Sequence, residues 1–244
     1  MGQISYVKET GEVLEAFSMS DNKWNEICAL PIGSLIMPYT DWPAIPKTSI
    51  RGLRFFAHHQ GYPEKLPKPK SYAHTRLQID IVQIARKLGF KAEMEVRKPN
   101  TSNPKWIADT LITSHTGQRI AFEVQLSSQH LDDFIERTNR YTESNIKVCW
   151  VLAEKPVADR LCKALCYKNK DYYKKTKKYL ADDERLLTLN LDIPNKDNYP
   201  EILPLFRFSR GLDNIKRLTL QDAIQGVIQE LPRWEHPNWK WGND

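Results

Sequence analysis

The chain has 244 residues, of which 27% are charged and 41% hydrophobic, which is the composition of a globular protein with a core of its own. No apolar run approaches the ~20 residues of a membrane-spanning helix, and the first residues lack the basic and apolar regions of a secretory signal. We therefore expect a cytoplasmic protein without a membrane partner. The formal net charge of +6 favours a polyanionic partner. The four cysteines form no C-x-x-C pair, which is typical of reduced thiols rather than of a zinc ribbon or a redox motif.

The first 62 residues are predicted to form a β-rich N-terminal region. Short elements are expected in it at residues 4–17 (a hairpin around Thr10-Gly11), 21–30 (a helix), and 35–37 and 53–56 (strands). Pro63, Pro67 and Pro69 then stand among lysines, a composition that favours an extended linker over residues 62–70. We therefore place a domain boundary after residue 62.

Residues 63–154 are predicted to form a second domain with the element order α-β-β-β-α-β. Apolar residues recur at helical spacing in the first helix, at Leu77, Ile81, Ile84 and Leu88. Strands are expected at residues 90–97, 106–113, 120–127 and 146–153, and a second helix from residue 131 to about residue 143. The last strand is apolar on both faces except at Lys147, so we expect both of its faces to be covered.

The second and third strands are joined by a tight loop. The segment His115-Thr116-Gly117 has the length of a three-residue hairpin loop, with glycine where a left-handed residue is needed. In that register Ser114 pairs with Gln118, and counting back places Asp109 opposite Glu123, with ~5 Å between their Cβ atoms. Two carboxylates at that distance repel each other, and a divalent cation such as Mg²⁺ is the simplest compensation. Two solvated acids on the open face of an antiparallel sheet would give the same pattern.

This order of elements, with an acid on the second strand and E-x-Q on the third, resembles the PD-(D/E)XK nuclease fold. More narrowly, the chain resembles the CoiA-like competence proteins of bacteria. The segments that carry this resemblance follow one another between about residues 35 and 153: Arg54-Phe55-Phe56-Ala57-His58, His74, Ala108-Asp109-Thr110-Leu111, Ile120 to Ser127, Arg137-Thr138 with Tyr141, and Trp150-Val151-Leu152. Each segment is weak alone, but the ordered set is specific.

The resemblance implies a metal-dependent DNA nuclease. It implies that Asp109, Glu123 and the main-chain carbonyl of Val124 hold Mg²⁺ or Mn²⁺, and that His74 faces the catalytic site. Gln125 stands where the wider superfamily has lysine; it can orient water but brings no charge, and a single electrostatic stabiliser is worth ~10²–10³ in rate. A capping or surface role is the alternative for His74.

One departure from the family concerns zinc. Many relatives carry a C-P-x-C pair, which resembles half of a zinc site, ahead of the segment that matches Arg54 to His58. This chain has Met37-Pro38-Tyr39-Thr40 there, and neither Met37 nor Thr40 supplies a thiolate. We therefore expect no zinc.

Residues 155–244 are predicted to form a basic, helical C-terminal region. Nine Lys or Arg against two Asp give residues 155–180 a formal charge of +7, and four tyrosines stand among the lysines. Basic groups interleaved with rings are typical of a nucleic-acid surface, and a solvated helix face is the alternative. We expect DNA contacts from this region and from the second core helix, at Arg137, Arg140, Lys174, Lys175, Lys177 and Lys178. An ion pair with Glu136 is the alternative for Arg140.

Two functions follow from these features. The first is a metal-dependent DNA nuclease that acts in bacterial DNA uptake, recombination, repair or defence, with recombination or DNA-processing proteins as further partners. The second is a catalytically weak or inactive nuclease-fold module that binds DNA or a recombination partner protein, and Gln125 favours it. The pathway, the form of the DNA and the oligomeric state are left open by the sequence.

Overall fold

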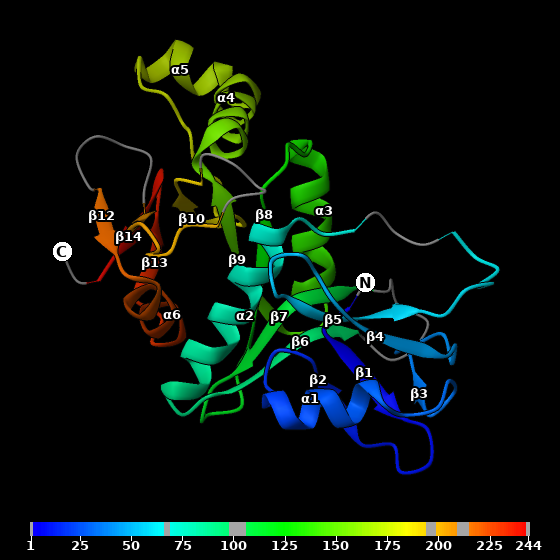
Figure 1. Ribbon diagram of the computed structural model, residues 1–244. Helices are drawn as coiled ribbons and strands as arrows, with labels where there is room; N and C mark the ends of the chain where they lie inside the picture. The colour runs from blue at the N-terminus through cyan, green and yellow to red at the C-terminus, as the bar shows by residue number, and fades with distance from the viewer. Residues whose placement is uncertain (1, 66–68, 98–105, 194–198, 209–214, 243–244) are drawn as a thin grey trace. The chain divides into compact units, whose positions relative to one another are not determined.

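The computed structural model describes residues 2–65, 69–97, 106–193, 199–208 and 215–242 (Figure 1). The chain divides into two compact units, Met1–Lys70 and Ser71–Asp244. No helix in these described ranges is both long enough and apolar enough to cross a membrane. The boundaries that we place at residues 62 and 154 stay predictions.

The first unit consists of two small antiparallel sheets and one helix. Its elements are β1 (Ile4–Val7), β2 (Val13–Glu15), α1 (Asp21–Cys28), β3 (Leu35–Ile36), β4 (Ala44–Thr48) and β5 (Arg54–His58). One sheet has the order β2-β1-β3 and the other pairs β4 with β5. Ser20 caps α1, since its side chain accepts a hydrogen bond from the main-chain N–H of Lys23, and Trp24 packs against Phe56 in the core. The predicted hairpin and helix are therefore present.

The second unit is built on a seven-stranded mixed sheet with the order β12-β11-β10-β9-β8-β7-β6. The elements predicted for residues 63–154 occur in the expected order, as α2 (Tyr72–Lys87), β6 (Lys91–Arg97), β7 (Ile107–Thr113), β8 (Arg119–Gln125), α3 (Leu131–Thr142) and β9 (Ile146–Ala153). Strand β7 is antiparallel to both β6 and β8, whereas β8 and β9 are parallel. The protein is thus a mixed α/β protein with a large sheet.

The C-terminal region is not simply helical, and this corrects the expectation from the sequence. It contains η1 (Glu154–Ala158), α4 (Asp159–Lys168), α5 (Lys170–Thr176), β10 (Leu187–Leu191), β11 (Phe206–Phe208), β12 (Lys216–Leu218), α6 (Leu220–Ile228), β13 (Pro232–Glu235) and β14 (Asn238–Trp241). Strand β10 pairs parallel with β9, and β11 and β12 continue the same sheet. Because β9 is buried on both faces, an edge position would leave its backbone groups unpaired, and the short strand β10 pairs with them instead.

The two faces of the sheet are covered by different residues of β8. Ala121 belongs to a core cluster that includes Phe134 and Tyr141 of α3. Its neighbours Ile120 and Phe122 point to the opposite face and are also buried. Helix α2 packs against β6, β7 and β8 as well as against α6. The middle of the sheet, where β7 and β8 lie, is therefore covered by α2 on one face and by residues of α3 on the other.

Helix α6 and the last hairpin are joined by a close contact at Gly226. A Cβ atom at this position would lie 2.1 Å from Cζ2 of Trp241. Trp241 is buried and also packs against Phe208, with ring centroids 5.0 Å apart. Only glycine leaves room for the indole ring here, because any larger residue at position 226 would meet that ring.

Candidate active site

The loop between β7 and β8 sets the register of the two acids. The main-chain N–H of Ser114 donates to the carbonyl of Gln118 at 2.8 Å, as predicted from the position of Gly117, whose φ is +81°. The pairs run from Thr113 with Arg119 to Thr110 with Phe122. The same register, continued by one residue, places Asp109 opposite Glu123.

At the acids, side chains replace the regular ladder between the strands. The main-chain N–H of Asp109 donates to Oε1 of Glu123 at 3.4 Å, and the N–H of Val124 donates to Oδ2 of Asp109 at 3.0 Å. Each carboxylate therefore accepts a hydrogen bond from the opposite strand. This reciprocal arrangement fixes both side chains against the sheet.

Glu123 is fully buried and is held by two residues of α3. Arg137 forms an ion pair with its Oε2 atom, and the hydroxyl of Tyr141 donates a hydrogen bond to Oε1. Arg137 and Tyr141 are four residues apart, which places them one turn apart on the same side of the helix. Arg137 also packs on Trp150, and its guanidinium carbon lies 4.8 Å from the centroid of that ring.

The environment of Glu123 changes its acidity. Burial raises the pKa of Glu123 to about 7, and the charge of Asp109 acts in the same direction. Arg137, the Tyr141 hydroxyl and the N–H of Asp109 lower that pKa, but they do not offset the burial. The pKa of Tyr141 is raised, chiefly by burial and then by the charge of Glu123. A buried acid that titrates near neutrality is typical of a functional site.

His74 of helix α2 lies beside Asp109. Its Nε2 atom is 3.3 Å from Oδ2 of Asp109, which is ion-pair distance without the geometry of a hydrogen bond. The helix brings it there through its first turn, where Ser71 caps the main-chain N–H of His74. One turn later Gln78 is fully buried, and neither its amide nitrogen nor its amide oxygen has a hydrogen-bond partner among the described residues.

Other predicted site residues lie elsewhere. The amide nitrogen of Gln125 donates to the main-chain carbonyl of Ser127 at 2.6 Å, so this side chain is tied to the loop after β8. Arg140 pairs with Glu136, which is the alternative that the sequence left open. The structure thus separates the two arginines of α3, since only Arg137 reaches the acids.

The donor chemistry of the acid pair fits a hard divalent cation. In the described part of the chain no group of three or more His, Cys, Asp or Glu lies close enough to hold a metal ion. An ion here would therefore have the carboxylates of Asp109 and Glu123 and would complete its shell with water and the carbonyl of Val124, as Mg²⁺ does in sites of few protein ligands. Asp109 keeps an exposed fraction of 9%, and the repulsion between the two acids is what a cation would relieve.

The predicted basic surface lies apart from the acids, on α5 and the residues that follow it. Lys174, Lys175, Lys177 and Lys178 are all exposed, and α5 has no buried residue. Figure 1 shows α4 and α5 extending beyond the ends of β9 and β10. Exposed rings accompany these lysines: Tyr167 is 76% exposed, and Tyr173 and Tyr179 stack with their centroids 4.6 Å apart.

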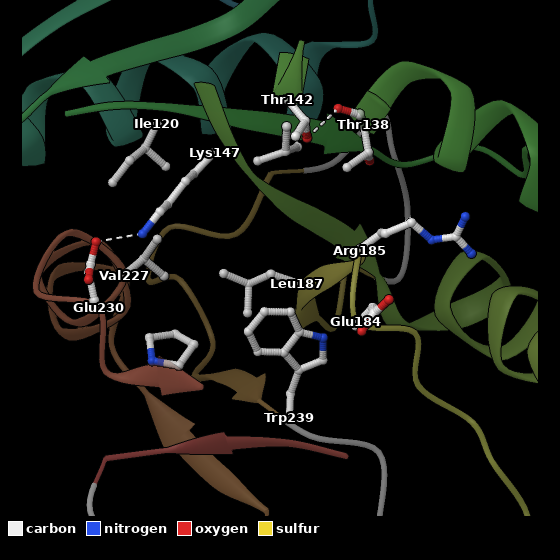
Figure 2. Close-up of a pocket in the computed structure, with 12 residues that line it drawn as sticks. Ile120, Thr138, Thr142, Lys147, Glu184, Arg185, Leu187, Val227, Glu230 and Trp239 are labelled. Carbon is white, nitrogen blue, oxygen red and sulfur yellow. Dashed lines mark hydrogen bonds and ion pairs between the residues drawn. The ribbon is translucent and has the colours of Figure 1, made fainter. Parts of the chain in front are cut away.

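A cavity of about 350 Å³ opens in another part of the second unit (Figure 2). Leu187, Val227 and Trp239 line its apolar wall, and the ion pair between Lys147 and Glu230 crosses one side of it. Neither acid of the pair lines this cavity, and its Lys147, Glu230 and Arg185 side chains form ion pairs. The cavity and the acid pair are therefore two separate features of the second unit.

Sequence reasoning assigned no role to Tyr141 and gave Arg137 only a role in DNA contact. The signal that could have found both was their four-residue spacing on the helix that follows β8. A fully buried glutamate needs a charged partner or hydrogen-bond donors, and a helix that packs over its strand is the nearest source.

Comparisons with known proteins concern the family of the chain. Residues 70–185, a little under half of the chain, match the family model described as "Competence protein CoiA, nuclease-like domain". This confirms the resemblance that the sequence motifs carry. A solved structure described as "crystal structure of a repair endonuclease from Pyrococcus abyssi" is 17% identical, with 52% of this chain and 50% of that chain covered and a TM-score of 0.27. The chain thus spans half the length of that protein, and a score so low supports no argument. No curated protein matches the sequence.

Proposed function

We propose that this chain, whose residues 70–185 carry a nuclease-like domain of the CoiA family, is a metal-dependent DNA nuclease with the PD-(D/E)XK fold. The observation that carries the proposal is the buried acid pair, in which Asp109 and Glu123 accept hydrogen bonds from each other's strand. Such a pair is costly to a fold and is therefore expected to serve chemistry.

The residues present divide the work of phosphodiester hydrolysis. Asp109, Glu123 and the carbonyl of Val124 would hold Mg²⁺ or Mn²⁺, which when bound lowers the pKa of a water ligand and polarises the phosphate. In the reaction the attacking water gives up a proton as its oxygen bonds to phosphorus, the bond from phosphorus to the leaving sugar oxygen breaks, and that oxygen receives a proton. His74, in contact with Asp109, orients this carboxylate and can carry a proton.

The proposal includes the partner, the compartment and the cofactor. DNA would lie along the exposed lysines of α5, and recombination or DNA-processing proteins are further partners of a protein that acts in bacterial DNA uptake, recombination, repair or defence. We place it in the cytoplasm. Zinc has no part in the proposal, because Thr40 stands where a cysteine ligand would be needed and its hydroxyl contacts Nε2 of His58 instead.

A catalytically weak or inactive module that binds DNA or a partner protein is the second candidate. Two contacts favour it: Gln125 is tied to Ser127, and Arg137 already neutralises Glu123. Labelled DNA incubated with purified protein and Mg²⁺ or Mn²⁺ separates the two functions. The nuclease requires cleavage that Asp109→Asn abolishes and that the matched variant Asp132→Asn, at an exposed acid of α3, retains. Binding without cleavage under both metals would establish the second function.

A further inference from the structure

We infer that Arg137 is a catalytic residue that supplies, from helix α3, the positive charge at the reacting phosphate that Gln125 cannot supply. This inference rests on the proposed nuclease function. Its basis is a contrast between two side chains: that of Gln125 is hydrogen-bonded to Ser127, whereas that of Arg137 is paired with Glu123.

The side-chain amide of Gln125 is hydrogen-bonded to the loop that follows β8. Its amide nitrogen donates to the carbonyl of Ser127 at 2.6 Å and lies 3.3 Å from the Ser127 hydroxyl. An amide held in this way has no charge to give and is committed to a local turn. A phosphoryl group in the transition state carries extra negative charge, and a positive side chain beside it adds to the stabilisation that a metal would supply.

Arg137 is held in the place where such a charge is needed. One nitrogen of its guanidinium pairs with Glu123, another lies 3.4 Å from the side-chain oxygen of Gln129, and its carbon lies over the ring of Trp150. These contacts restrict the side chain and so reduce the entropy that it loses when it binds a ligand.

The guanidinium still has donors to offer. The Arg137 side chain is 34% exposed although its partner Glu123 is fully buried. A guanidinium carries five N–H donors in a planar fork that matches phosphate oxygens. One edge can thus stay on the carboxylate while the other faces solvent and a bound phosphate.

Arg140 shows that this position is not shared by every basic residue of α3. It lies three residues further along, pairs with Glu136 and has no contact with either acid in the described structure. Arg137 is therefore distinguished by its partner and not by its charge alone.

The first test measures DNA affinity in EDTA, where no cleavage occurs, across a salt titration. If Arg137 touches a phosphate, Arg137→Gln should lower the slope of log affinity against log salt by about 0.9. An unchanged slope in a folded Arg137→Gln protein would overturn the inference. Because this readout needs no activity, it decides the role of Arg137 even if the wild type fails to cleave, an outcome that would count against the proposed function alone.

The second test measures cleavage with Mg²⁺. Arg137→Gln should slow it by ~10²–10³, at least tenfold more than Arg140→Gln, which removes the same charge from the same helix. The double variant Gln125→Lys/Arg137→Gln should recover tenfold or more of the loss, because its lysine brings a charge from the strand. No recovery in a folded double variant would assign Arg137 to positioning Glu123 only.

Arg137→Lys covers the case in which the glutamine variant does not fold. Its ammonium group keeps a positive charge beside Glu123, but it lacks the planar guanidinium that can donate to a carboxylate and a phosphate at once, so cleavage should fall about tenfold. A wild-type rate in this variant would contradict the inference.

Discussion

The acidity of Glu123 gives a prediction about stability that can be measured without metal. An ordinary glutamate has a pKa of 4.5, and burial raises that of Glu123 to about 7. Since the raised value belongs to the folded state, folding favours the protonated acid. The stability that this brings is complete below about pH 4.5 and is lost as the pH rises through about 7.

The magnitude follows from the same two values. The difference between a pKa of 4.5 and one of about 7 corresponds to about 3 kcal/mol, most of which falls between about pH 5 and pH 8. Glu123→Gln removes the titrating group, so the variant should lack this loss of unfolding free energy. The variant also removes the carboxylate that pairs with Arg137. This loss lowers the free energy of unfolding by a similar amount at every pH, so it does not change how that free energy depends on pH.

Urea denaturation of both proteins in EDTA, at a series of pH values, is the measurement. The groups around Glu123, which are Asp109, His74, Arg137 and Tyr141, are present in both proteins. Glu136→Gln is the matched control, because Glu136 is an exposed glutamate of α3 and should change the pH dependence little. The reasoning fails if wild type and Glu123→Gln show the same pH dependence between about pH 5 and pH 8.

Two further predictions concern the basic surface and the C-terminal hairpin. Neutralising Lys174, Lys175, Lys177 and Lys178 together should lower the slope of log DNA affinity against log salt by about 3 to 4. It should also weaken the binding of all DNA sequences alike, and a salt titration measures both effects. An unchanged slope would mean that these lysines form only a solvated helix face. Gly226→Ala should lower the free energy of unfolding by ~1–3 kcal/mol, because the new Cβ meets the ring of Trp241 at 2.1 Å. In a Trp241→Ala background the same change should stabilise the helix by about 1 kcal/mol, and destabilisation there as well would show that the ring is not the cause.

The register of the acids could be predicted because it is local. A three-residue loop with Gly117 in the left-handed conformation fixes which residues of β7 and β8 face each other, and no other part of the chain enters that argument. The element order from α2 to β9 was predictable for a similar reason, since each element carries its own periodicity.

The partners of Glu123 could not be predicted in the same way. Arg137 and Tyr141 reach it only because α3 packs over the sheet with one particular rotation, and the sequence of the helix shows its apolar side but not the residue beneath each polar one. Strand β10 was missed because five residues, LTLNL, carry little signal until β9 offers them an edge.

The site illustrates how a buried acid pair can be tolerated before any cation arrives. Glu123 has an arginine, a tyrosine hydroxyl and a main-chain N–H, whereas Asp109 has the N–H of Val124 and a histidine at ion-pair distance. Of the two acids, Asp109 is the more exposed, so it is the acid that an entering ion would meet first. A metal at this pair would share Glu123 with Arg137, and two cations on one carboxylate repel each other. The contact between Arg137 and Glu123 is therefore expected to lower the affinity of this acid pair for a metal.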